Sequence, residues 1–552
     1  MITPSVPLLF AQAGELPLDW LDFTVLVGSV LAVAAYGLYM GRREEGTADY
    51  FLAGRSVAWW AIAGSIFGTN VSSHHLVGMM GAGLKEGFAQ ANFEFGAICG
   101  LLMLCYFFLP LYRRMGVYTL SEYLGRRYDD RSRFLYSVTN MAFLLIQLCG
   151  TLILGAITIE ELTRGSTYAV SYSAAVWGIS LVAAAYTGFG GLKAVIYTDV
   201  IQSALLLVGA GVIAVLAIYH PDVGGISGLL AKEPQKFHVF FPADHKELPW
   251  TGVLTGLMIL HFYYWGTNQF MVQRALGAKT GWDGRMGIIA AGFFKLLIPF
   301  LCIVPGMAAG YILSIDPQTQ SDTAFAGLTR QLLPTGYGLV GLVMAGLVGA
   351  ILSTVDSMMN STATLFTFDI YQKYVRPAAS EQRLIWVGRA AMTVLVAVAI
   401  WLSLAFRDTQ QGGRSIFLTM ADYNAYLVPG VLVAFLAGIF QANVTATGSF
   451  ACILTGPIAS VALERGALHG LDHNLQAFHR AGLAALVSYV VLLTVSLLYR
   501  HERGAENEQY LWWRYRHSGD DEGSIHRPAW QRDGLWAVLL AVLTIALCCY
   551  FA

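Results

Sequence analysis

The chain is a succession of long apolar segments separated by short polar connections, and this pattern restricts it to very few folds. A hydrocarbon core about 30 Å thick needs about 20 apolar residues for each helix that crosses it. Backbone polar groups inside a bilayer have to be satisfied within the protein, so only helices and closed barrels span it. Segments of this length predict helices. We therefore predict an all-α polytopic membrane protein.

The composition supports this class and argues against several others. Of the 552 residues, 56% are hydrophobic and only 12% are charged, whereas soluble domains carry about 25% charged residues. The net charge of −1 gives no basis for nucleic-acid binding. The seven cysteines lie in apolar runs without CxxC spacing, which predicts neither a disulfide framework nor a transition-metal site. The N-terminal segment has no basic region, so we expect no cleaved signal peptide.

Fourteen segments have the length of a membrane helix, and we predict a single transmembrane domain over residues 1–552. They lie near residues 19–40, 57–83, 91–112, 135–162, 168–188, 194–218, 250–272, 287–313, 337–365, 385–406, 416–440, 445–464, 480–499 and 534–551. With the N-terminus outside, most of the 34 lysine and arginine residues fall in cytoplasmic loops, as the positive-inside rule requires. An even number of spans then predicts that both termini are extracytoplasmic, in a plasma (inner) membrane.

Two of these segments are interrupted by polar residues and glycine. The second contains GTNVSSHH (68–75), and the seventh contains YYWGTNQ (263–269). Non-helical backbone at membrane depth is tolerated only where protein buries it or where it lines a water-filled cavity. Paired interrupted helices in two halves of a chain indicate the midplane binding site of a secondary transporter. The alternative is that the small residues only let helices pack closely.

A third unusual segment carries two hydroxyls and a carboxylate within an otherwise apolar span. Ser353, Thr354 and Asp356 lie in the stretch AILSTVDSMMNSTATLFTFD. A charged side chain at mid-membrane costs about 2.5–3.5 kcal/mol on insertion scales, which makes it a candidate functional residue. Hydroxyls, an acid and freed carbonyls suit a small hard cation. We therefore predict an ion-coupled membrane transporter.

Three motifs at and near these segments are similar to those of a known family. They are Gly190–Val195 with Thr198, Asp199 and Gln202; Tyr264–Gln269 with Gln273 and Arg274; and Asn360–Thr364 through Asp369–Tyr371. At these residues the chain resembles the sodium/solute symporter family, nearest its sodium–glucose (sugar) branch, over about residues 20–500. The resemblance implies a leucine-transporter-like fold of two inverted five-helix repeats with extra helices. The repeats would span 57–218 and 250–440, with peripheral helices in 19–40 and 445–551.

The resemblance implies one sodium site between the second and ninth segments. Its expected ligands are the carbonyls of Gly68, Val71 and Ala350 and the hydroxyls of Ser353 and Thr354. Alternatively, the two hydroxyls bond back to carbonyls one helical turn earlier.

Some members of the family carry a second cation site, for which this chain offers Asp199, Asp356 and Ser357 together with Ser353. Two neighbouring acids share either a proton or a cation, so sodium or a proton is the expected second co-ion. The alternative is that Asp356 pairs with a neighbouring group in a purely structural role.

For the substrate, the resemblance implies a sugar site with an aromatic gate. The matching residues are Asn70, His75, Glu94, His261 and Lys295, with Tyr264 and Trp265 at the gate. Alternatively, Glu94 and Lys295 form only a structural ion pair, and the histidines are ordinary core residues. Sugar carriers usually have a glutamine where this chain has Ala421, so Asp422 or Asn424 would have to replace it. The substrate would otherwise be another hexose, a pentose, an inositol or a non-sugar.

We therefore expect a sodium-driven symporter that imports a glucose- or galactose-like monosaccharide by alternating access, with sodium as co-substrate and no cofactor. The alternatives are sodium- or proton-coupled symport of an inositol or another small polar solute, a passive facilitator or channel, and a membrane sensor. An enzyme is not expected, since neither a nucleophile–base pair, a zinc spacing nor a phosphate loop is present in the sequence.

Overall fold

The computed structural model describes residues 18–42, 46–315, 321–334, 336–407, 416–465, 477–502, 505–515 and 528–552. Within these ranges the backbone forms helices and turns, and extended pairing is limited to two isolated bridges. The all-α prediction is therefore confirmed. The expectation of an uncleaved N-terminal segment and the position of the N-terminus itself concern residues outside these ranges.

Eleven helices in the described part are long and apolar enough to cross a membrane. They are α1 (Trp20–Met40), His74–Met115, α8 (Asp130–Thr163), α9 (Tyr172–Ile218), Gly281–Ile312, Leu339–Val375, α18 (Glu381–Ala405), Leu418–Phe440, α20 (Ala446–Arg465), α21 (Ala477–Leu498) and α23 (Asp533–Tyr550).

The count of eleven differs from the predicted fourteen at three places. The segments predicted near 57–83 and 91–112 appear as one span, because the second half of the former continues into the latter. The segments near 168–188 and 194–218 are the two arms of α9. The segment near 250–272 is too interrupted to count as one regular helix.

Gly191 separates the two arms of α9. Its backbone has φ 53° and ψ −159°, a conformation that favours glycine because a Cβ atom would be strained there. The preceding Gly190 lies against α1, where a Cβ on Gly41 would come within 2.1 Å of the Gly190 Cα. The short connection between the two predicted segments, residues 189–193, is thus a sharp bend at a helix–helix contact.

Both predicted helix breaks are present. Helix α3 (Trp59–Asn70) ends at Val71, which has ψ 90°, and the chain resumes a helical course in a π-helical turn at His74–Met79 and in α4 (Met80–Glu86). The second break follows the π-helical turn Tyr263–Thr267, where Asn268 is extended before α13 (Gln269–Leu276) begins. By contrast, α17 (Leu339–Leu365) is continuous and buried along most of its length.

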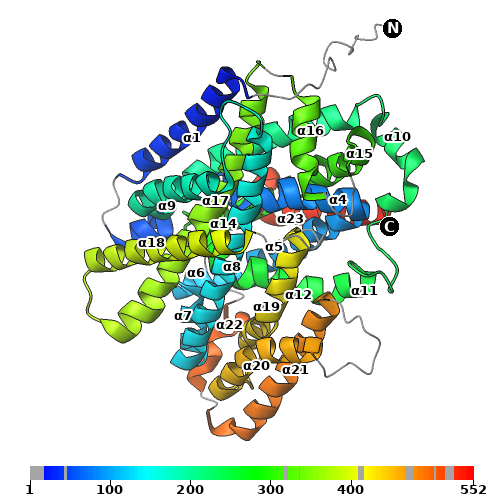
Figure 1. Ribbon diagram of the computed structural model, residues 1–552. Helices are drawn as coiled ribbons and strands as arrows, with labels where there is room; N and C mark the ends of the chain where they lie inside the picture. Colours follow the sequence, from blue (N-terminus) through cyan, green and yellow to red (C-terminus); the bar gives the residue numbers. More distant parts are fainter. Residues whose placement is uncertain are drawn as a thin grey trace.

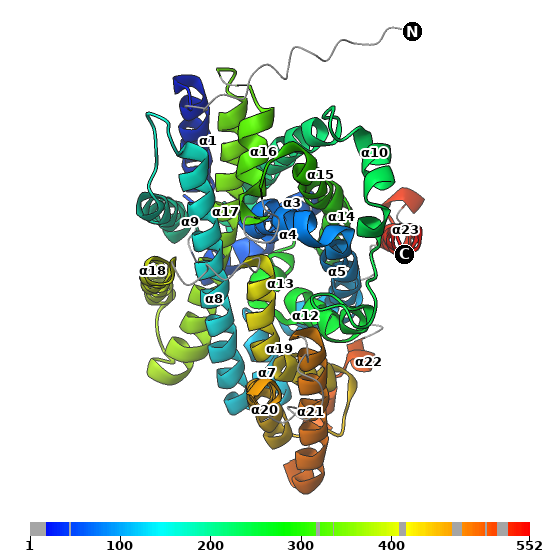
Figure 2. The same cartoon turned by 45° about the vertical axis from the view of Figure 1, so that its right-hand side comes forward.

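Helix α8 runs along much of the height of the molecule in the view of Figure 2 and contacts both α17 and α19 (Ile416–Phe440). Helix α1 lies on one flank, against α9 and α17. On the other flank, α23 packs on α14 (Gly281–Lys295) and α5 (Asn92–Met103). Helices α20 and α21 pair with each other and with α19 at one end of the molecule (Figure 1). The two broken helices therefore lie within a shell of continuous ones.

The connection 219–249 is ordered and contains α10 (Gly225–Lys232) and a 3₁₀ turn at Pro234–Phe237. We call this connection the cap. The end of α23 lies beside it (Figure 1), and the Val239 N–H donates to the Phe551 carbonyl at 2.8 Å. The Asn92 side chain on α5 donates to the Val239 carbonyl at 2.6 Å. These contacts connect the cap both to the last helix and to a helix that carries the candidate site.

Candidate functional site

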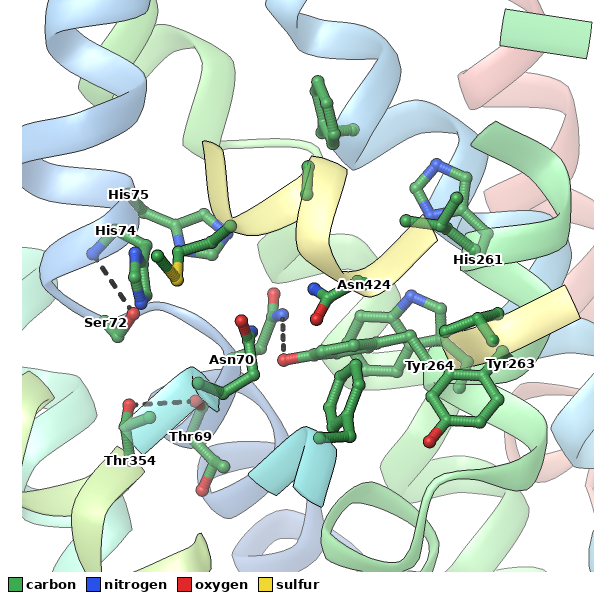
Figure 3. A pocket seen from close by; sticks show the side chains of 18 of the residues that line it. Thr69, Asn70, Ser72, His74, His75, His261, Tyr263, Tyr264, Thr354 and Asn424 are labelled. Atoms are coloured by element: carbon green, nitrogen blue, oxygen red, sulfur yellow. Dashed lines mark hydrogen bonds between the residues drawn. The ribbon is translucent and has the colours of Figure 1, made fainter. Parts of the chain in front are cut away.

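A pocket lies between the two helix breaks (Figure 3), and residues from seven regions of the chain line it. The α3 break contributes Thr69, Asn70 and the two histidines that follow, and the break before α13 contributes the run Tyr263–Trp265. Leu257, Leu260 and His261, which precede this run, also line the pocket, and helices α5, α8, α14, α17 and α19 supply the remaining walls. All seven residues predicted to bind the substrate line this one pocket.

An ion pair lies at the centre of the predicted substrate site. The Lys295 Nζ is 2.6 Å from Glu94 Oε2, and His75 Nε2 is 3.2 Å from Glu94 Oε1. The Glu94 side chain is 1% exposed and that of Lys295 is 2% exposed. Removing two charges from water is costly, and it is offset only when the pair is close and further hydrogen bonds complete it. The pair meets both conditions.

The chain of contacts continues from Lys295 toward the predicted gate. Its ammonium donates to Asn70 Oδ1 and lies 5.0 Å from the ring centroid of Trp265, within cation–π distance. The Asn70 amide in turn donates to the Tyr264 hydroxyl at 3.2 Å (Figure 3). His261 lines the same pocket, but its Nε2 bonds to the Asn92 carbonyl at 3.2 Å and not to the ion pair.

Two further amides line the pocket, and the amide oxygen of each lacks a partner. Gln147 on α8 is 9% exposed and Asn424 on α19 is 8% exposed, and neither oxygen accepts a hydrogen bond from any described residue. Of the two candidates to replace the glutamine missing at Ala421, Asn424 lines the pocket, whereas Asp422 forms an ion pair with Arg480.

The five residues predicted to bind sodium are all buried at the contact between the α3 break and α17. The Thr354 hydroxyl is 3.2 Å from the Thr69 carbonyl and 3.0 Å from that of Ala350. The second of these contacts is the back-bond that the alternative interpretation expected. A Cβ on Gly68 would come within 2.3 Å of Ser203 Oγ and 3.0 Å of the Asp199 carbonyl, so α3 approaches α9 closely here. Only glycine fits this contact.

Ser353 faces a different group, the fully buried carboxylate of Asp199. The Ser353 hydroxyl donates to Asp199 Oδ1 at 2.5 Å, and Ser65 and Thr69 donate to Oδ2 at 2.5 and 3.1 Å. Arg274 lies on the same side, with its Nη2 3.5 Å from Asp199 Oδ2. Asp199 is thus held by three hydroxyls and a guanidinium.

Asp356 lies next to this group and is also fully buried. It accepts from the Tyr186 hydroxyl at 2.5 Å and from Ser357 at 3.0 Å, and Ser357 in turn accepts from Arg274. The three residues predicted for a second cation, Asp199, Asp356 and Ser357, are therefore joined through Arg274. We call this group, with Ser65, Thr69, Tyr186 and Ser353, the acidic centre.

The acidic centre contains two carboxylates and one guanidinium, so it carries one more negative than positive charge when both acids are ionised. An uncompensated charge in a buried site is expensive. The centre therefore favours one additional positive charge, either a bound cation or a proton on one carboxylate.

Sequence reasoning did not assign roles to Arg274, Ser65, Thr69 or Tyr186. Arg274 appeared only as part of a motif, although an arginine directly after a helix break in a membrane span is itself a signal of a buried partner. The two pocket amides have a weaker signal, since Gln147 is only a lone amide in the apolar run 141–150.

The chain matches known proteins over most of its length. A sequence model of the Sodium:solute symporter family matches residues 50–456. The chain is 32% identical to the sodium/glucose cotransporter of Vibrio parahaemolyticus over 80% of its own length and 84% of that protein. It is also 32% identical to sodium/myo-inositol cotransporter 2 of Oryctolagus cuniculus, over 86% of this chain and 76% of that one.

Solved structures show the same architecture. A Na⁺-coupled sialic acid symporter in a substrate-bound, outward-open state superposes with a TM-score of 0.76 at 22% identity, covering 87% of this chain and 98% of that one. Mhp1, a nucleobase-cation-symport-1 family transporter, superposes with a TM-score of 0.54 at 14% identity, covering 85% and 99%. The leucine-transporter-like fold is therefore confirmed. Together with the family match, these findings show that the chain belongs to the sodium:solute symporter family and is a sodium-coupled, multi-pass membrane transporter.

Proposed function

We propose that this transporter couples sodium entry to the uptake of a neutral polyol, a monosaccharide or a cyclitol, by alternating access. The observation that carries the proposal is the buried chain His75–Glu94–Lys295–Asn70–Tyr264 in a pocket between two broken helices. Relatives named for glucose and for myo-inositol match at the same identity, so both substrate classes remain candidates.

The chemistry of the pocket fits a neutral polyol better than an ion. Glu94 and Lys295 cancel each other's charge, so the pocket offers no net charge to an anionic substrate. Each hydroxyl of a polyol both donates and accepts, and carboxylate, ammonium, imidazole and amide groups together supply both kinds of partner. A site of this kind rejects an analogue that lacks a hydroxyl, because its own buried polar groups would be left unpaired.

We propose that one sodium ion is coordinated by the carbonyls of Gly68, Val71 and Ala350 and by the hydroxyls of Ser353 and Thr354. The proposal is supported by the closeness of Thr354 to two carbonyl oxygens at the point where α3 loses its helical course. Hard cations take oxygen ligands, and an interrupted helix frees carbonyls to supply them.

We further propose that Asp199, Asp356 and Ser357 hold a second co-ion, sodium or a proton. The excess negative charge of the acidic centre supports this assignment. The position of Thr69 supports coupling between cation binding and substrate binding. Thr69 lines the pocket, its hydroxyl donates to Asp199, and its carbonyl accepts from Thr354. Cation and substrate should therefore each raise the affinity for the other.

The proposed transport cycle uses the two inverted repeats, 57–218 and 250–440, which would rock against each other around the pocket. We propose that Tyr264 closes the inner side of the pocket while Trp265 flanks the substrate. Both termini would be extracytoplasmic, in the plasma or inner membrane.

The test is uptake into proteoliposomes with an inward sodium gradient and an inside-negative potential. Glucose, galactose and myo-inositol are offered as labelled substrates, and the same gradient of potassium is the control. We expect sodium-dependent accumulation of at least one of the three above its external concentration. Equal uptake in potassium would instead indicate a passive facilitator, and uptake of none would overturn the proposed substrate class.

A further inference from the structure

We propose that Asn424, together with Gln147, is the specificity-determining group of the pocket and selects its substrate by accepting hydrogen bonds from hydroxyls of the neutral polyol. This inference rests on the proposed function and deepens it. It concerns a second polar surface of the pocket, formed by α8 and α19, to which the residues of the Glu94–Lys295 chain do not contribute.

The first observation is that, among the residues that the structure describes, the amide oxygens of Gln147 and Asn424 have no hydrogen-bond partner, although both side chains are more than nine-tenths buried. Buried polar groups in proteins are nearly always hydrogen-bonded, and an unmade bond costs about 1–3 kcal/mol. Asn424 lines the pocket and appears among the residues around it in Figure 3. A ligand that brings hydrogen-bond donors there relieves the cost.

The second observation concerns the face of α19 that borders the pocket. Met420, Ala421, Asn424 and Val428 all line it, at spacings that put them on one side of a helix. Asn424 contributes the amide on this face, and Ala421 one turn earlier is too small to reach far into the pocket. Asp422 points elsewhere, toward Arg480. The recognition group on this helix is therefore an asparagine at 424.

The two amide oxygens and the balanced charges of the pocket indicate the chemistry of the ligand. An oxygen without a donor partner requires an N–H or O–H on the guest, and an ionised carboxylate has none to give. The cancelled charges of Glu94 and Lys295 also disfavour an ammonium group. A neutral hydroxyl both donates a hydrogen bond and carries no charge. We therefore expect the substrate to carry two hydroxyls that bind Asn424 and Gln147, in addition to those that bind the Glu94–Lys295 chain.

The experiment is a double-mutant cycle that combines a substitution in the protein with the removal of one hydroxyl from the ligand. The best substrate of the uptake panel and its mono-deoxy analogues, one for each ring position, are bound to the purified full-length protein in saturating sodium. Wild type, Asn424→Ala and Gln147→Leu are compared by titration calorimetry. Tyr423→Phe is the matched control, since Tyr423 is on the same helical turn but is exposed on the outer surface.

We expect Asn424→Ala to weaken binding of the parent polyol by about 5- to 150-fold, the loss of one buried hydrogen bond. One deoxy analogue should bind wild type and Asn424→Ala equally, because it lacks the hydroxyl in question. Gln147→Leu should behave in the same way toward a different analogue, and Tyr423→Phe should bind like wild type.

The inference is overturned if Asn424→Ala weakens the parent and every analogue by the same factor, which is the signature of a shape or folding effect. It is also overturned if Asn424→Ala binds the parent as wild type does. Failure of the wild type to bind any neutral polyol is a separate result, because it overturns the proposed function itself.

Discussion

The pocket between the two helix breaks and the acidic centre are neighbouring polar regions buried in the same bundle, and they are incomplete in different ways. In the pocket the charges of Glu94 and Lys295 balance, but two amide oxygens have no hydrogen-bond partner within the described part of the chain. In the acidic centre the carboxylate oxygens of Asp199 and Asp356 are all hydrogen-bonded, but the charges do not balance. Unmet hydrogen bonds suit a neutral guest, and unmet charge suits a cation.

Thr69 is the residue that belongs to both regions. Its hydroxyl bonds to Asp199, its carbonyl faces Thr354, and it lines the pocket. A change of occupancy in one region therefore reaches the other through a single helix end, the point at which α3 is broken.

The largest expected effect comes from destroying the charge balance of the pocket. Glu94→Ala leaves the Lys295 ammonium buried without a counter-charge, a cost of about 3–5 kcal/mol. We expect this cost to lower the unfolding temperature, and the loss of a charged hydrogen-bond acceptor, about 1.5–3 kcal/mol, to lower substrate affinity by roughly 10- to 150-fold. The double variant Glu94→Ala/Lys295→Met should regain thermal stability but not uptake. Wild-type uptake by Glu94→Ala would show that the pair is not part of the substrate site.

The next effect tests the charge excess of the acidic centre. Asp356→Asn removes the negative charge that the second co-ion would balance, so one fewer charge should move per cycle. At 100 mV and a tenfold gradient each cation contributes about 3.7 kcal/mol, so accumulation should fall by about 500-fold.

The readout for Asp356→Asn is the reversal potential of uptake in proteoliposomes, which gives the ratio of charge to substrate. Tyr186→Phe is the matched control, because it removes a hydrogen bond to Asp356 but keeps the charge. An unchanged ratio in Asp356→Asn would assign Asp356 a structural role.

A smaller effect is expected at the proposed sodium site. Thr354→Val keeps the shape of the side chain but removes its hydroxyl, and a hydrogen-bonding or coordinating contact to a charge contributes about 1.5–3 kcal/mol. The sodium concentration for half-maximal uptake should rise by about 10- to 150-fold. Thr393→Val, which removes a similar back-bond on the outer surface of α18, should leave it unchanged. If both variants depend on sodium as the wild type does, Thr354 is not a sodium ligand and the sodium site lies elsewhere.

The smallest effect is expected at Tyr264, the residue proposed to close the pocket. Tyr264→Phe removes the hydroxyl that accepts from Asn70, a neutral contact of about 1 kcal/mol. Substrate affinity should fall about fivefold while sodium affinity in the absence of substrate stays the same. Direct binding titrations measure both, with the exposed Tyr219→Phe as control. A loss of sodium affinity alone would connect Tyr264 to the cation site instead.

The broken helices could be predicted from sequence because their cause is local. A run such as GTNVSSHH carries more polar groups than a regular membrane helix can satisfy, so the break at Val71 follows from the residues around it. The number of continuous spans could not be predicted, because a bend such as that at Gly191 depends on how closely α1 approaches.

The partners within the site were harder to predict because they are distant in sequence. Arg274 and Asp199 are 75 residues apart, and only the packing of α13 against α3 and α17 brings them together. The choice between Asp422 and Asn424 depended on the rotation of α19 about its axis. A rotation of that kind is fixed by neighbouring helices such as α21, whose Arg480 pairs with Asp422.

The contact between the cap and the end of α23 gives a practical means of observing the protein at work. His238 on the cap lies 3.1 Å from the carbonyl of residue 552, and Phe551 packs on Phe88 and Phe237. A dye attached beside residue 552, paired with a quencher on α10, would respond to any separation of these two elements. Single-molecule recordings could then follow the contact between the cap and α23 during turnover without a label inside the pocket.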